Sequence, residues 1–262
     1  MKNDLEINNL IIDGNWLAFR CHSVNENNMI DEFINKTHRL RDIYNPENTH
    51  VVWDLPGSSL YRKNIYEDYK KSRKEKDPSF IINLHFLFKN VGDFGMYQWI
   101  PCFGEGDDCI ATLCEKIGQD KKILIYSIDK DFLQLVKNNI FLLKPINNKD
   151  ALICENNIKD IVIKYNGKEI SGLDADGWLD FQTLVGDNVD GVKGIDGIGP
   201  MKAISMLKEV PCVVNAILEE NDKYRKIDWF NEMIKKKYEL RKMRSLVMLK
   251  NNIKIMRIYK YI

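Results

Sequence analysis

The 262-residue sequence lacks several features that mark other classes of protein. It has no uninterrupted apolar run near the ~20 residues that a membrane-spanning helix needs. Its first ten residues lack the cationic head and apolar stretch of a secretory signal. It also has no internal repeat and no low-complexity tract. The sequence therefore predicts a soluble, cytoplasmic, globular protein that makes no contact with a membrane.

The six cysteines and four histidines form no recognisable disulfide or metal pattern. No Cys-x-x-Cys pair is present, and the histidines lack zinc-site spacing relative to the cysteines. A chain of this length can build its core without disulfides, so we expect reduced, mostly buried cysteines. No pattern typical of a nucleophilic triad is present either. Any metal chemistry would therefore rest on carboxylates.

The formal net charge is only +1, but the two signs are unevenly distributed. From residue 221 onward there are thirteen Lys/Arg against four Asp/Glu, so residues 1–220 carry 26 against 34. A cationic end and an acidic body suit a protein that binds a polyanion with one part and metal cations with the other. A solvated helical face explains the basic end equally well.

Three short apolar runs, each β-prone, end at an aspartate. The runs and their aspartates are Leu10–Ile12 with Asp13, His50–Trp53 with Asp54, and Ile123–Ile128 with Asp129. Helix-length segments separate the strands, a pattern that predicts a parallel sheet covered by helices on both faces. Ligands bind such sheets beyond the carboxyl ends of the strands, where these aspartates lie.

A predicted helix over 106–117 begins with an unusual concentration of acid. Its opening turn contains Glu105, Asp107 and Asp108. One carboxylate at a helix start caps free amides and suits the helix dipole. Three in four positions exceed what capping needs, and they repel one another unless a cation lies among them. The cluster is either a metal site or an elaborate cap.

Residues 57–90 form an insertion between strands that is rich in basic residues and tyrosine. We expect Tyr61, Tyr66 and Tyr69 to share one face of a basic helix. Such a helix can contact phosphates and stack bases on its rings. On its own the pattern favours an ordinary surface helix with packed tyrosines. Asp77 and Pro78 predict the start of a second helix.

The most distinctive segment is 186–200, which has four glycines in nine residues between 191 and 199. It predicts a tight hairpin that exposes backbone amides, followed by a helix that begins near Pro200. A helix start of this kind binds phosphate without reading base sequence.

In their order along the chain, these motifs resemble those of the structure-specific 5′-nuclease family. The family includes flap endonucleases, bacteriophage 5′-3′ exonucleases and the 5′-nuclease domain of bacterial DNA polymerase I. The matching motifs, spread over residues 10–207, are Asp13, Asp54, Glu105–Asp108, Ser127–Asp131, Gly186–Asp190 and Gly194–Gly199.

The resemblance implies an α/β fold with a PIN-like parallel sheet core, a helical arch, and a C-terminal helical region that contains a helix-three-turn-helix motif. It divides the chain into a nuclease core over 1–171, with the arch at 57–90, and a DNA-binding region over 172–262. The helix-three-turn-helix motif falls at about 186–207.

The resemblance also assigns roles to individual residues. It implies a carboxylate cluster for metal ions made of Asp13, Asp54, Glu105, Asp107, Asp108, Asp129, Asp131, Asp187 and Asp190. Catalytic roles fall on Lys70, Arg73 and Asp129, and Tyr69 is expected to stack on a base. DNA contacts are implied for Tyr69, Lys70, Arg73, Gly197, Gly199 and Lys202. The backbone carbonyls of Val192, Ile195 and Ile198 are expected to hold K⁺.

The implied activity is Mg²⁺-dependent hydrolysis of phosphodiester bonds near the 5′ end of DNA, as a 5′-3′ exonuclease and 5′-flap endonuclease in replication and repair. Two Mg²⁺ ions fit oxygen-only ligands, and Mn²⁺ is expected to substitute. Expected partners are DNA 5′ ends, flaps and single-strand/duplex junctions, together with RNA–DNA hybrids, bound by a monomer. The Lys/Asn-rich composition is compatible with a phage-encoded protein that acts in the host cytoplasm.

Two alternatives remain open at this point. One is a non-catalytic nucleic-acid-binding protein on the same scaffold, which the complete set of carboxylates disfavours. The other is a PIN-type ribonuclease, which the glycine hairpin and basic arch disfavour. The sequence also departs from the family where a lysine usually follows the hairpin, because Met201 stands there. Either Lys202 or the backbone amides take over that phosphate contact.

Overall fold

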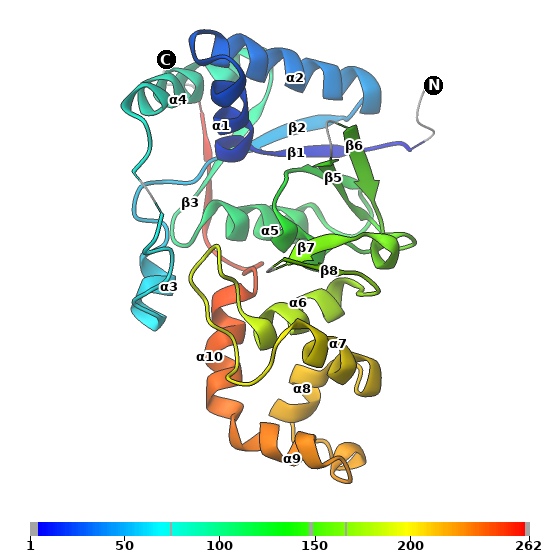
Figure 1. The fold of residues 1–262 in the computed structure, drawn as a ribbon. Helices are drawn as coiled ribbons and strands as arrows, with labels where there is room; N and C mark the ends of the chain where they lie inside the picture. The colour runs from blue at the N-terminus through cyan, green and yellow to red at the C-terminus, as the bar shows by residue number, and fades with distance from the viewer. Residues whose placement is uncertain (1–4, 74, 147–148, 166, 260–262) are drawn as a thin grey trace. The chain divides into compact units, whose positions relative to one another are not determined.

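The structure, a computed structural model, describes residues 5–73, 75–146, 149–165 and 167–259. The chain forms two compact units (Figure 1). The first, here called the core unit, takes residues 1–58, 74–154 and 250–262. The second, here called the helical unit, takes residues 59–73 and 155–249.

The core unit is built on one twisted sheet with the strand order β6-β5-β4-β1-β2-β3-β9. The strands are β1 (Asn9–Asp13), β2 (Asn48–Val52), β3 (Tyr97–Pro101), β4 (Ile123–Tyr126), β5 (Ile140–Ile146), β6 (Lys149–Ile153) and β9 (Ile255–Ile258). β1 to β5 are parallel, whereas β6 and β9 run antiparallel to their neighbours at the two edges. The carboxyl ends of β1, β2 and β4 therefore meet at one edge of the sheet.

Helices cover both faces of this sheet. They are α1 (Gly14–Val24), α2 (Met29–Tyr44), α4 (Pro78–Asn90) and α5 (Gly106–Ile117), with the 3-10 turns η1 (Glu26–Asn28), η2 (Val91–Phe94) and η3 (Lys130–Leu135). α1, α2 and α4 enclose a core with the alternate side chains Leu10 and Ile12 of β1. α5 packs on the other face (Figure 1). Because successive side chains of a strand point to opposite faces of the sheet, the central strands supply apolar side chains to both layers.

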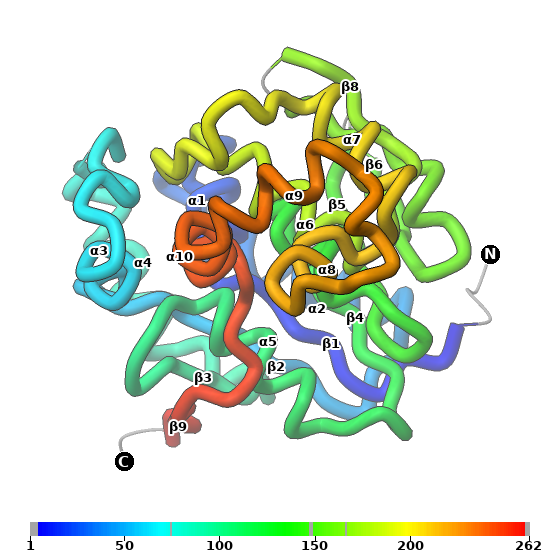
Figure 2. Tube along the Cα trace, turned by 90° about the horizontal axis from the view of Figure 1, so that it is seen from below, coloured from blue at the N-terminus to red at the C-terminus, as the bar shows by residue number. Residues whose placement is uncertain are grey.

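The helical unit consists mainly of short helices. Its elements are α3 (Leu60–Ile65), η4 (Ile158–Asp160), the hairpin β7 (Ile163–Tyr165) and β8 (Lys168–Ile170), α6 (Ala175–Val185), α7 (Pro200–Glu209), α8 (Val213–Leu218), η5 (Asp222–Tyr224), α9 (Asp228–Lys235) and α10 (Lys237–Val247). α6 is the central helix, and α7, α8 and α10 pack against it. Figure 2 follows the chain through α8, α9 and α10.

A buried ion pair joins two helices of this unit. Arg244 of α10 donates to Asp180 of α6 at 2.8 Å, and the Val214 backbone N–H of α8 donates to the other Asp180 oxygen at 3.1 Å. Asp180 is only 3% exposed, so both of its oxygens need such partners. The basic C-terminal stretch is therefore partly structural.

Several predicted boundaries are confirmed. α4 begins at Pro78, where the Asp77 carboxylate accepts the Ser79 N–H at 2.8 Å. α7 begins at Pro200, as predicted. The region over 172–262, predicted to be helical, also contains one strand, because the chain returns to the core unit after residue 249 and β9 pairs with β3. Among the described residues, no helix has both the length and the apolar character needed to span a bilayer.

The predicted basic helix in 57–90 is also wrong. α3 is only six residues long, and Lys70 adopts a left-handed backbone with φ +55°. Residues 59–73 belong to the helical unit, whereas α4 belongs to the core unit, so 57–90 is not a single body. Arg62 explains part of this packing: it is 3% exposed and its guanidinium donates to the carbonyls of Leu246 and Met248, which end α10.

The unit boundaries also differ from the predicted division after residue 171, since the helical unit begins at residue 155 and includes 59–73. Among the described residues none of the cysteines forms a disulfide. Three of them, Cys21, Cys109 and Cys114, are buried, while Cys102 and Cys212 are exposed, so burial is less general than expected.

Candidate active site

Two of the strand-end aspartates are linked through one hydroxyl. Asp13 ends β1 and caps α1, with one carboxylate oxygen accepting the Trp16 N–H at 3.1 Å. Its other oxygen accepts the Ser127 hydroxyl at 2.8 Å, and the Asp129 N–H donates to the same Ser127 oxygen at 3.1 Å. Because β1 and β4 are adjacent, these two carboxylates lie at neighbouring strand ends. Ser127 therefore orients Asp13.

Asp54, just beyond β2, joins this edge through the start of α5. Its carboxylate accepts the Gly106 N–H at 3.1 Å, and its own N–H donates to the Asn15 side chain at 2.7 Å. Asn15 is a supporting residue that the sequence analysis missed. A polar residue directly after the Asp13-Gly14 pair was the only available signal.

Asp54 and Asp129 both act electrostatically on Asp13. The pKa of Asp13 is raised to about 6, chiefly by burial and further by the charges of Asp129 and Asp54. Hydrogen bonds from Ser127 and Trp16 oppose the shift. Among the residues that the structure describes, no three His, Cys, Asp or Glu side chains are grouped closely enough to hold one ion as they stand. The metal-ligand set remains a prediction.

This electrostatic strain leads to a stability prediction for Asp13→Asn. Between the unfolded pKa of about 3.8 and the folded pKa of about 6, the folded state binds a proton that the unfolded state has released. Ionised Asp13 therefore destabilises the metal-free fold above pH 6, and this cost disappears as the pH falls toward 4. We expect Asp13→Asn to be more stable than the parent at pH 7.5, by about 1–3 kcal/mol.

Urea unfolding in EDTA at pH 5, 6 and 7.5 measures this difference, with exposed Asp120→Asn as the control. The advantage of Asp13→Asn over the parent should shrink toward pH 5. A difference that stays constant across the three pH values would show that Asp13 is not electrostatically strained.

The acidic opening of α5 is partly a cap. Asp108 is fully buried, one of its oxygens accepts the Glu105 N–H at 3.1 Å, and the other accepts the Lys250 N–H at 2.9 Å. Both oxygens are thus engaged by backbone donors, which favours a structural role for Asp108 over the predicted metal ligation. Glu105 is the N-cap residue of α5 and is 3% exposed, and Asp107 lies half-buried in the first turn.

Lys144 on β5 was missed by the sequence analysis. It is 9% exposed, and its ammonium donates to the Ile128 carbonyl, immediately before Asp129. Burial lowers the pKa of Lys144 to about 8, against the attraction of Asp129 and Asp131. This buried cation supports the loop that carries both aspartates. The signal for this role in the sequence was a lysine within an apolar, β-prone run.

In the helical unit, Asp190 contacts three of the six residues predicted to bind DNA. Its carboxylate accepts the Tyr69 hydroxyl at 3.1 Å and the Arg73 guanidinium at 2.8 Å, and Lys70 Nζ lies 3.6 Å away. The Lys70 N–H also donates to the Asp190 carbonyl at 2.8 Å. Burial would raise the pKa of Asp190, but Lys70, Arg73 and Tyr69 hold it below its usual value. Tyr69 is only 3% exposed, so its ring is covered rather than presented for stacking.

The glycine hairpin predicted at 186–200 is present. Asp187 and Val192 exchange two backbone hydrogen bonds of 2.7 Å, and the Asp187 carboxylate accepts the Val189 N–H at 2.8 Å. Gly186 and Gly194 face one another with φ near +79° and +75°. A Cβ on Gly194 would lie 2.3 Å from the Val185 carbonyl carbon. Only glycine allows this approach.

We expect Gly194→Ala to destabilise the helical unit by about 3 kcal/mol or more, because both the left-handed backbone and the crowding oppose a side chain. Gly197→Ala is the matched control, since Gly197 also has a left-handed φ of +79° but faces open space. Gly197→Ala should destabilise the helical unit by about 1 kcal/mol. Hydrogen exchange of the α6 and α7 amides measures both, and equal losses would contradict the crowding argument.

The start of α7 is open. Gly199 is its N-cap residue, and a Cβ at Gly197 or Gly199 would meet nothing within 4 Å. Lys202 is exposed and its ammonium lies 3.4 Å from the Gly197 carbonyl, whereas Met201 is 61% exposed. Lys202 thus places a cation at this helix start.

The predicted potassium ligands are partly engaged. The Val192 carbonyl accepts the Asp187 N–H at 2.7 Å, and the Ile195 carbonyl accepts the Ile198 N–H at 3.0 Å. The side chains of all three predicted residues are buried. The K⁺ site remains a prediction.

The predicted site residues fall into two groups. The core unit contains Asp13, Asp54, Glu105, Asp107, Asp108, Asp129 and Asp131, and the helical unit contains Tyr69, Lys70, Arg73, Asp187, Asp190, Gly197, Gly199 and Lys202. Their combination into a single site remains a prediction.

Two models of known protein families match this chain. One family model, described as the 5′-3′ exonuclease N-terminal resolvase-like domain, matches residues 8–165, and a second, the 5′-3′ exonuclease C-terminal SAM fold, matches residues 173–260. The chain is a member of the 5′-3′ exonuclease family. The predicted family is therefore confirmed, as is the α/β class with a mostly parallel sheet and a helical C-terminal region.

Curated relatives of this 5′-3′ exonuclease family member agree. A flap endonuclease Xni of Shewanella loihica is 32% identical over 212 residues, which cover 79% of this chain and 78% of the relative. A 5′-3′ exonuclease of Aquifex aeolicus is 36% identical over 183 residues, covering 69% of this chain and 58% of the relative. The chain is accordingly an enzyme of the 5′-3′ exonuclease and flap endonuclease type.

Solved structures share the fold. A bacteriophage T5 5′-exonuclease with bound zinc matches with a TM-score of 0.73 at 19% identity, covering 93% of this chain and 90% of that one. A pseudo-enzyme-product complex of the bacteriophage T5 flap endonuclease with DNA and metal ions matches with a TM-score of 0.72 at 19% identity, covering 93% and 89%.

Proposed function

We propose that the chain is a Mg²⁺-dependent, structure-specific 5′ nuclease that hydrolyses phosphodiester bonds near the 5′ ends of DNA, both as an exonuclease and as a flap endonuclease. The observation that carries this proposal is the link from Asp13 through Ser127 to Asp129 at the carboxyl edge of the sheet, beside Asp54. A family member with these three mutually repelling carboxylates is suited to hold divalent cations.

The donor chemistry fits hard cations. The candidate ligands are all carboxylates, and Mg²⁺ binds through a few of these while it retains water. We assign Asp13, Asp54, Glu105, Asp107 and Asp129 nearest to two Mg²⁺ ions, with Mn²⁺ able to substitute. Bound divalent ions would supply a water of lowered pKa and neutralise charge on the reacting phosphate. Asp131, Asp187 and Asp190 would act through water.

Other residues of the chain position the substrate. Lys70 and Arg73 would place their charges on the scissile phosphate, where fixed cations act most strongly in a dry site. Tyr69 would stack on a base only after its ring is uncovered, since the side chain is now buried and its hydroxyl is bonded to Asp190. Ser127 holds Asp13 in one orientation because its hydroxyl donates a hydrogen bond to the Asp13 carboxylate.

The start of α7 would grip duplex DNA. Gly197, Gly199 and Lys202 offer backbone and ammonium donors to a phosphate, with no dependence on base sequence. K⁺ held by backbone carbonyls of the hairpin would strengthen this contact. We propose DNA 5′ ends, flaps and junctions as substrates for a monomer acting in the cytoplasm, with RNA–DNA hybrids as further substrates.

Labelled substrates test the function directly. A 5′-flap duplex, a gapped duplex, a single strand and an RNA–DNA hybrid would each be incubated with Mg²⁺, Mn²⁺ or EDTA. We expect cleavage at the flap junction and stepwise release from 5′ ends with either metal ion, and none in EDTA. Cleavage of RNA alone would establish the ribonuclease alternative, and binding without any cleavage would establish the non-catalytic one.

DNA affinity should depend steeply on salt, because the proposed contacts are to phosphates. With about four such contacts, the dissociation constant of Asp129→Asn for a flap duplex should rise about 100-fold between 50 and 200 mM salt. Adding Lys202→Ala to Asp129→Asn should make the plot of log affinity against log salt concentration less steep, by the equivalent of about one phosphate contact. Fluorescence anisotropy measures the dissociation constant of both variants at each salt concentration. An affinity that does not change with salt would disprove phosphate-dominated binding.

A further inference from the structure

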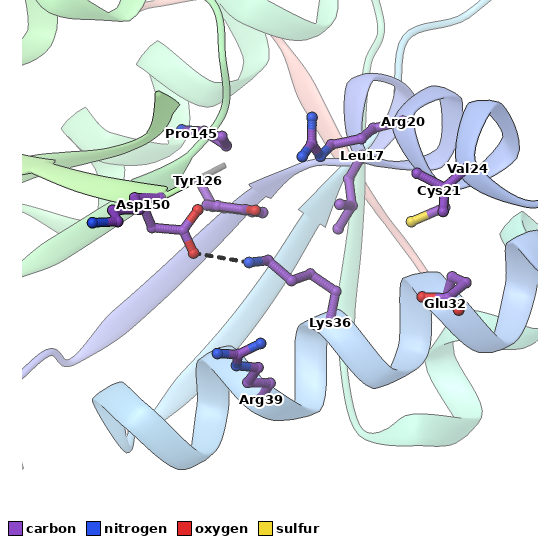
Figure 3. Close-up of a pocket in the computed structure, with 11 residues that line it drawn as sticks. Leu17, Arg20, Cys21, Val24, Glu32, Lys36, Arg39, Tyr126, Pro145 and Asp150 are labelled. Carbon is purple, nitrogen blue, oxygen red and sulfur yellow. Dashed lines mark hydrogen bonds and ion pairs between the residues drawn. The ribbon is translucent and has the colours of Figure 1, made fainter. Parts of the chain in front are cut away.

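A pocket of about 460 Å³ lies in the core unit between α1, α2 and the ends of β4, β5 and β6. Figure 3 shows its lining, which has an apolar part and a charged part. The apolar part is Leu17, Cys21, Val24, Tyr126 and Pro145, and the charged part is Arg20, Glu32, Lys36, Arg39, Lys149 and Asp150. Its volume falls in the range of about 300–1,000 Å³ that small-molecule sites occupy.

The charges of the pocket are unbalanced. Four cationic and two acidic side chains line it, which leaves a formal excess of two positive charges. Lys36 donates to Asp150 at 2.8 Å, and its ammonium lies 5.0 Å from the centre of the Tyr126 ring. Figure 3 shows this pair with Arg20 of α1 and Arg39 of α2 on either side of it. Asp150 is thus already paired.

The two arginines carry the excess charge. Both are exposed, and neither forms a hydrogen bond or ion pair with any residue that the structure describes. Guanidinium groups match phosphate oxygens geometrically and are weakly hydrated, so unpaired arginines at a pocket wall favour a phosphate-bearing ligand. The apolar wall beside them would cover a ring that is itself apolar on its faces.

The size of the excess charge favours a terminal phosphate. A phosphomonoester carries close to two negative charges near pH 7, whereas each phosphodiester of a continuous strand carries one. We propose that this pocket binds a nucleoside 5′-monophosphate, with the phosphate on the arginine-lined wall and the base on the apolar wall. The proposal rests on the proposed exonuclease function, since such a mononucleotide is what hydrolysis at a 5′ end would release.

The pocket and the candidate active site both adjoin α1 and the end of β4, but they share no residues. α1 runs from Asp13 to Leu17 and Arg20, and Tyr126 immediately precedes Ser127 in the chain. A mononucleotide bound here would leave the catalytic carboxylates open to the next phosphodiester.

Isothermal titration of the full chain in EDTA at pH 7.5 tests the proposal, with thymidine 5′-monophosphate, its 3′ isomer, thymidine and inorganic phosphate as the probes. Without metal ions, the acidic edge of the sheet repels all the anions, so binding reports on cationic sites. We expect one 5′-monophosphate per chain, bound at least about 10-fold more tightly than inorganic phosphate, and no binding of thymidine.

Variants locate the binding. The double variant Arg20→Gln plus Arg39→Gln should weaken 5′-monophosphate binding about 100-fold. Asp150→Asn releases Lys36 and should tighten it several-fold. The matched control is Lys89→Gln plus Lys116→Gln, which removes two exposed positive charges elsewhere in the core unit and should change nothing. Circular dichroism checks that every variant is folded.

Each contrary result overturns the proposal. Unaltered binding in the arginine double variant places the nucleotide elsewhere. Equal affinity for inorganic phosphate reduces the pocket to a general anion site. Tighter binding of a 5′-phosphorylated oligonucleotide assigns the pocket to a strand end instead of a released nucleotide, provided that the arginine double variant loses that added affinity. DNA cleavage by the parent protein with Mg²⁺ is measured separately. If the parent does not cleave DNA, the proposed function is wrong. If it cleaves DNA but does not bind the nucleotide, only this inference is wrong.

Discussion

Asp129→Asn is expected to abolish DNA cleavage while it leaves DNA binding and folding intact. Asp129 caps the turn that follows β4, where its side-chain oxygen accepts the Asp131 N–H at 2.9 Å and its own N–H donates to Ser127. Asparagine keeps an oxygen for the cap and occupies the same volume. The variant therefore loses the negative charge and little else.

That charge is what the proposed cation site needs. Losing one ligand removes several kcal/mol of transition-state stabilisation, so cleavage of a 5′-flap duplex should fall about 10³-fold or more. Mn²⁺ binding, measured by titration calorimetry, should weaken in parallel. Asp120→Asn is the matched control, because it removes an exposed acid of the same unit. A variant that cuts at the parental rate would falsify the assignment of Asp129.

The sequence was sufficient, for a physical reason, to predict that the strand-end aspartates lie at one edge of the sheet. Apolar runs of β-branched residues form buried strands, and their parallel order requires all carboxyl ends to lie on one side. Asp13 and Asp129 had to become neighbours once β1 and β4 paired. Helix starts were equally predictable where local chemistry decides them, as at Pro78 and Pro200.

Residues whose roles depend on distant partners could not be predicted. Asp108 appears in sequence as one more acid, and only the structure shows that its carboxylate accepts the Lys250 N–H, 142 positions away. Arg62 appears as one basic residue among many, yet it is buried against the end of α10. Local pattern carries no information on such pairings, because tertiary contacts decide them.

β9 illustrates the same limit. Its short sequence has a weak strand pattern, and it lies in the C-terminal region that the family resemblance predicts to be helical. Pairing with β3 at the sheet edge supplies the hydrogen bonds that make Ile255–Ile258 a strand. This strand was not predicted because the stabilising partner lies more than 150 residues earlier.

Lys70→Ala is expected to lower the turnover number far more than the affinity for DNA. In this structure Lys70 is engaged with Asp190, through its ammonium at 3.6 Å and its backbone N–H at 2.8 Å. Alanine keeps a Cβ at the same left-handed backbone, so the strain at φ +55° is unchanged and the backbone bond persists. Tyr69 and Arg73 retain their own bonds to Asp190, so the segment should stay in place.

The loss is thus confined to one ammonium group. If that group neutralises charge that develops on the scissile phosphate, its removal acts on the transition state and not on the bound ground state. We expect the single-turnover rate on a 5′-flap duplex to fall about 10²- to 10³-fold and the dissociation constant to rise less than about 10-fold. Lys71→Ala is the control, since Lys71 is exposed and pairs with Asp68, three positions before it. Equal losses of rate and affinity in Lys70→Ala would instead show that Lys70 only docks the substrate.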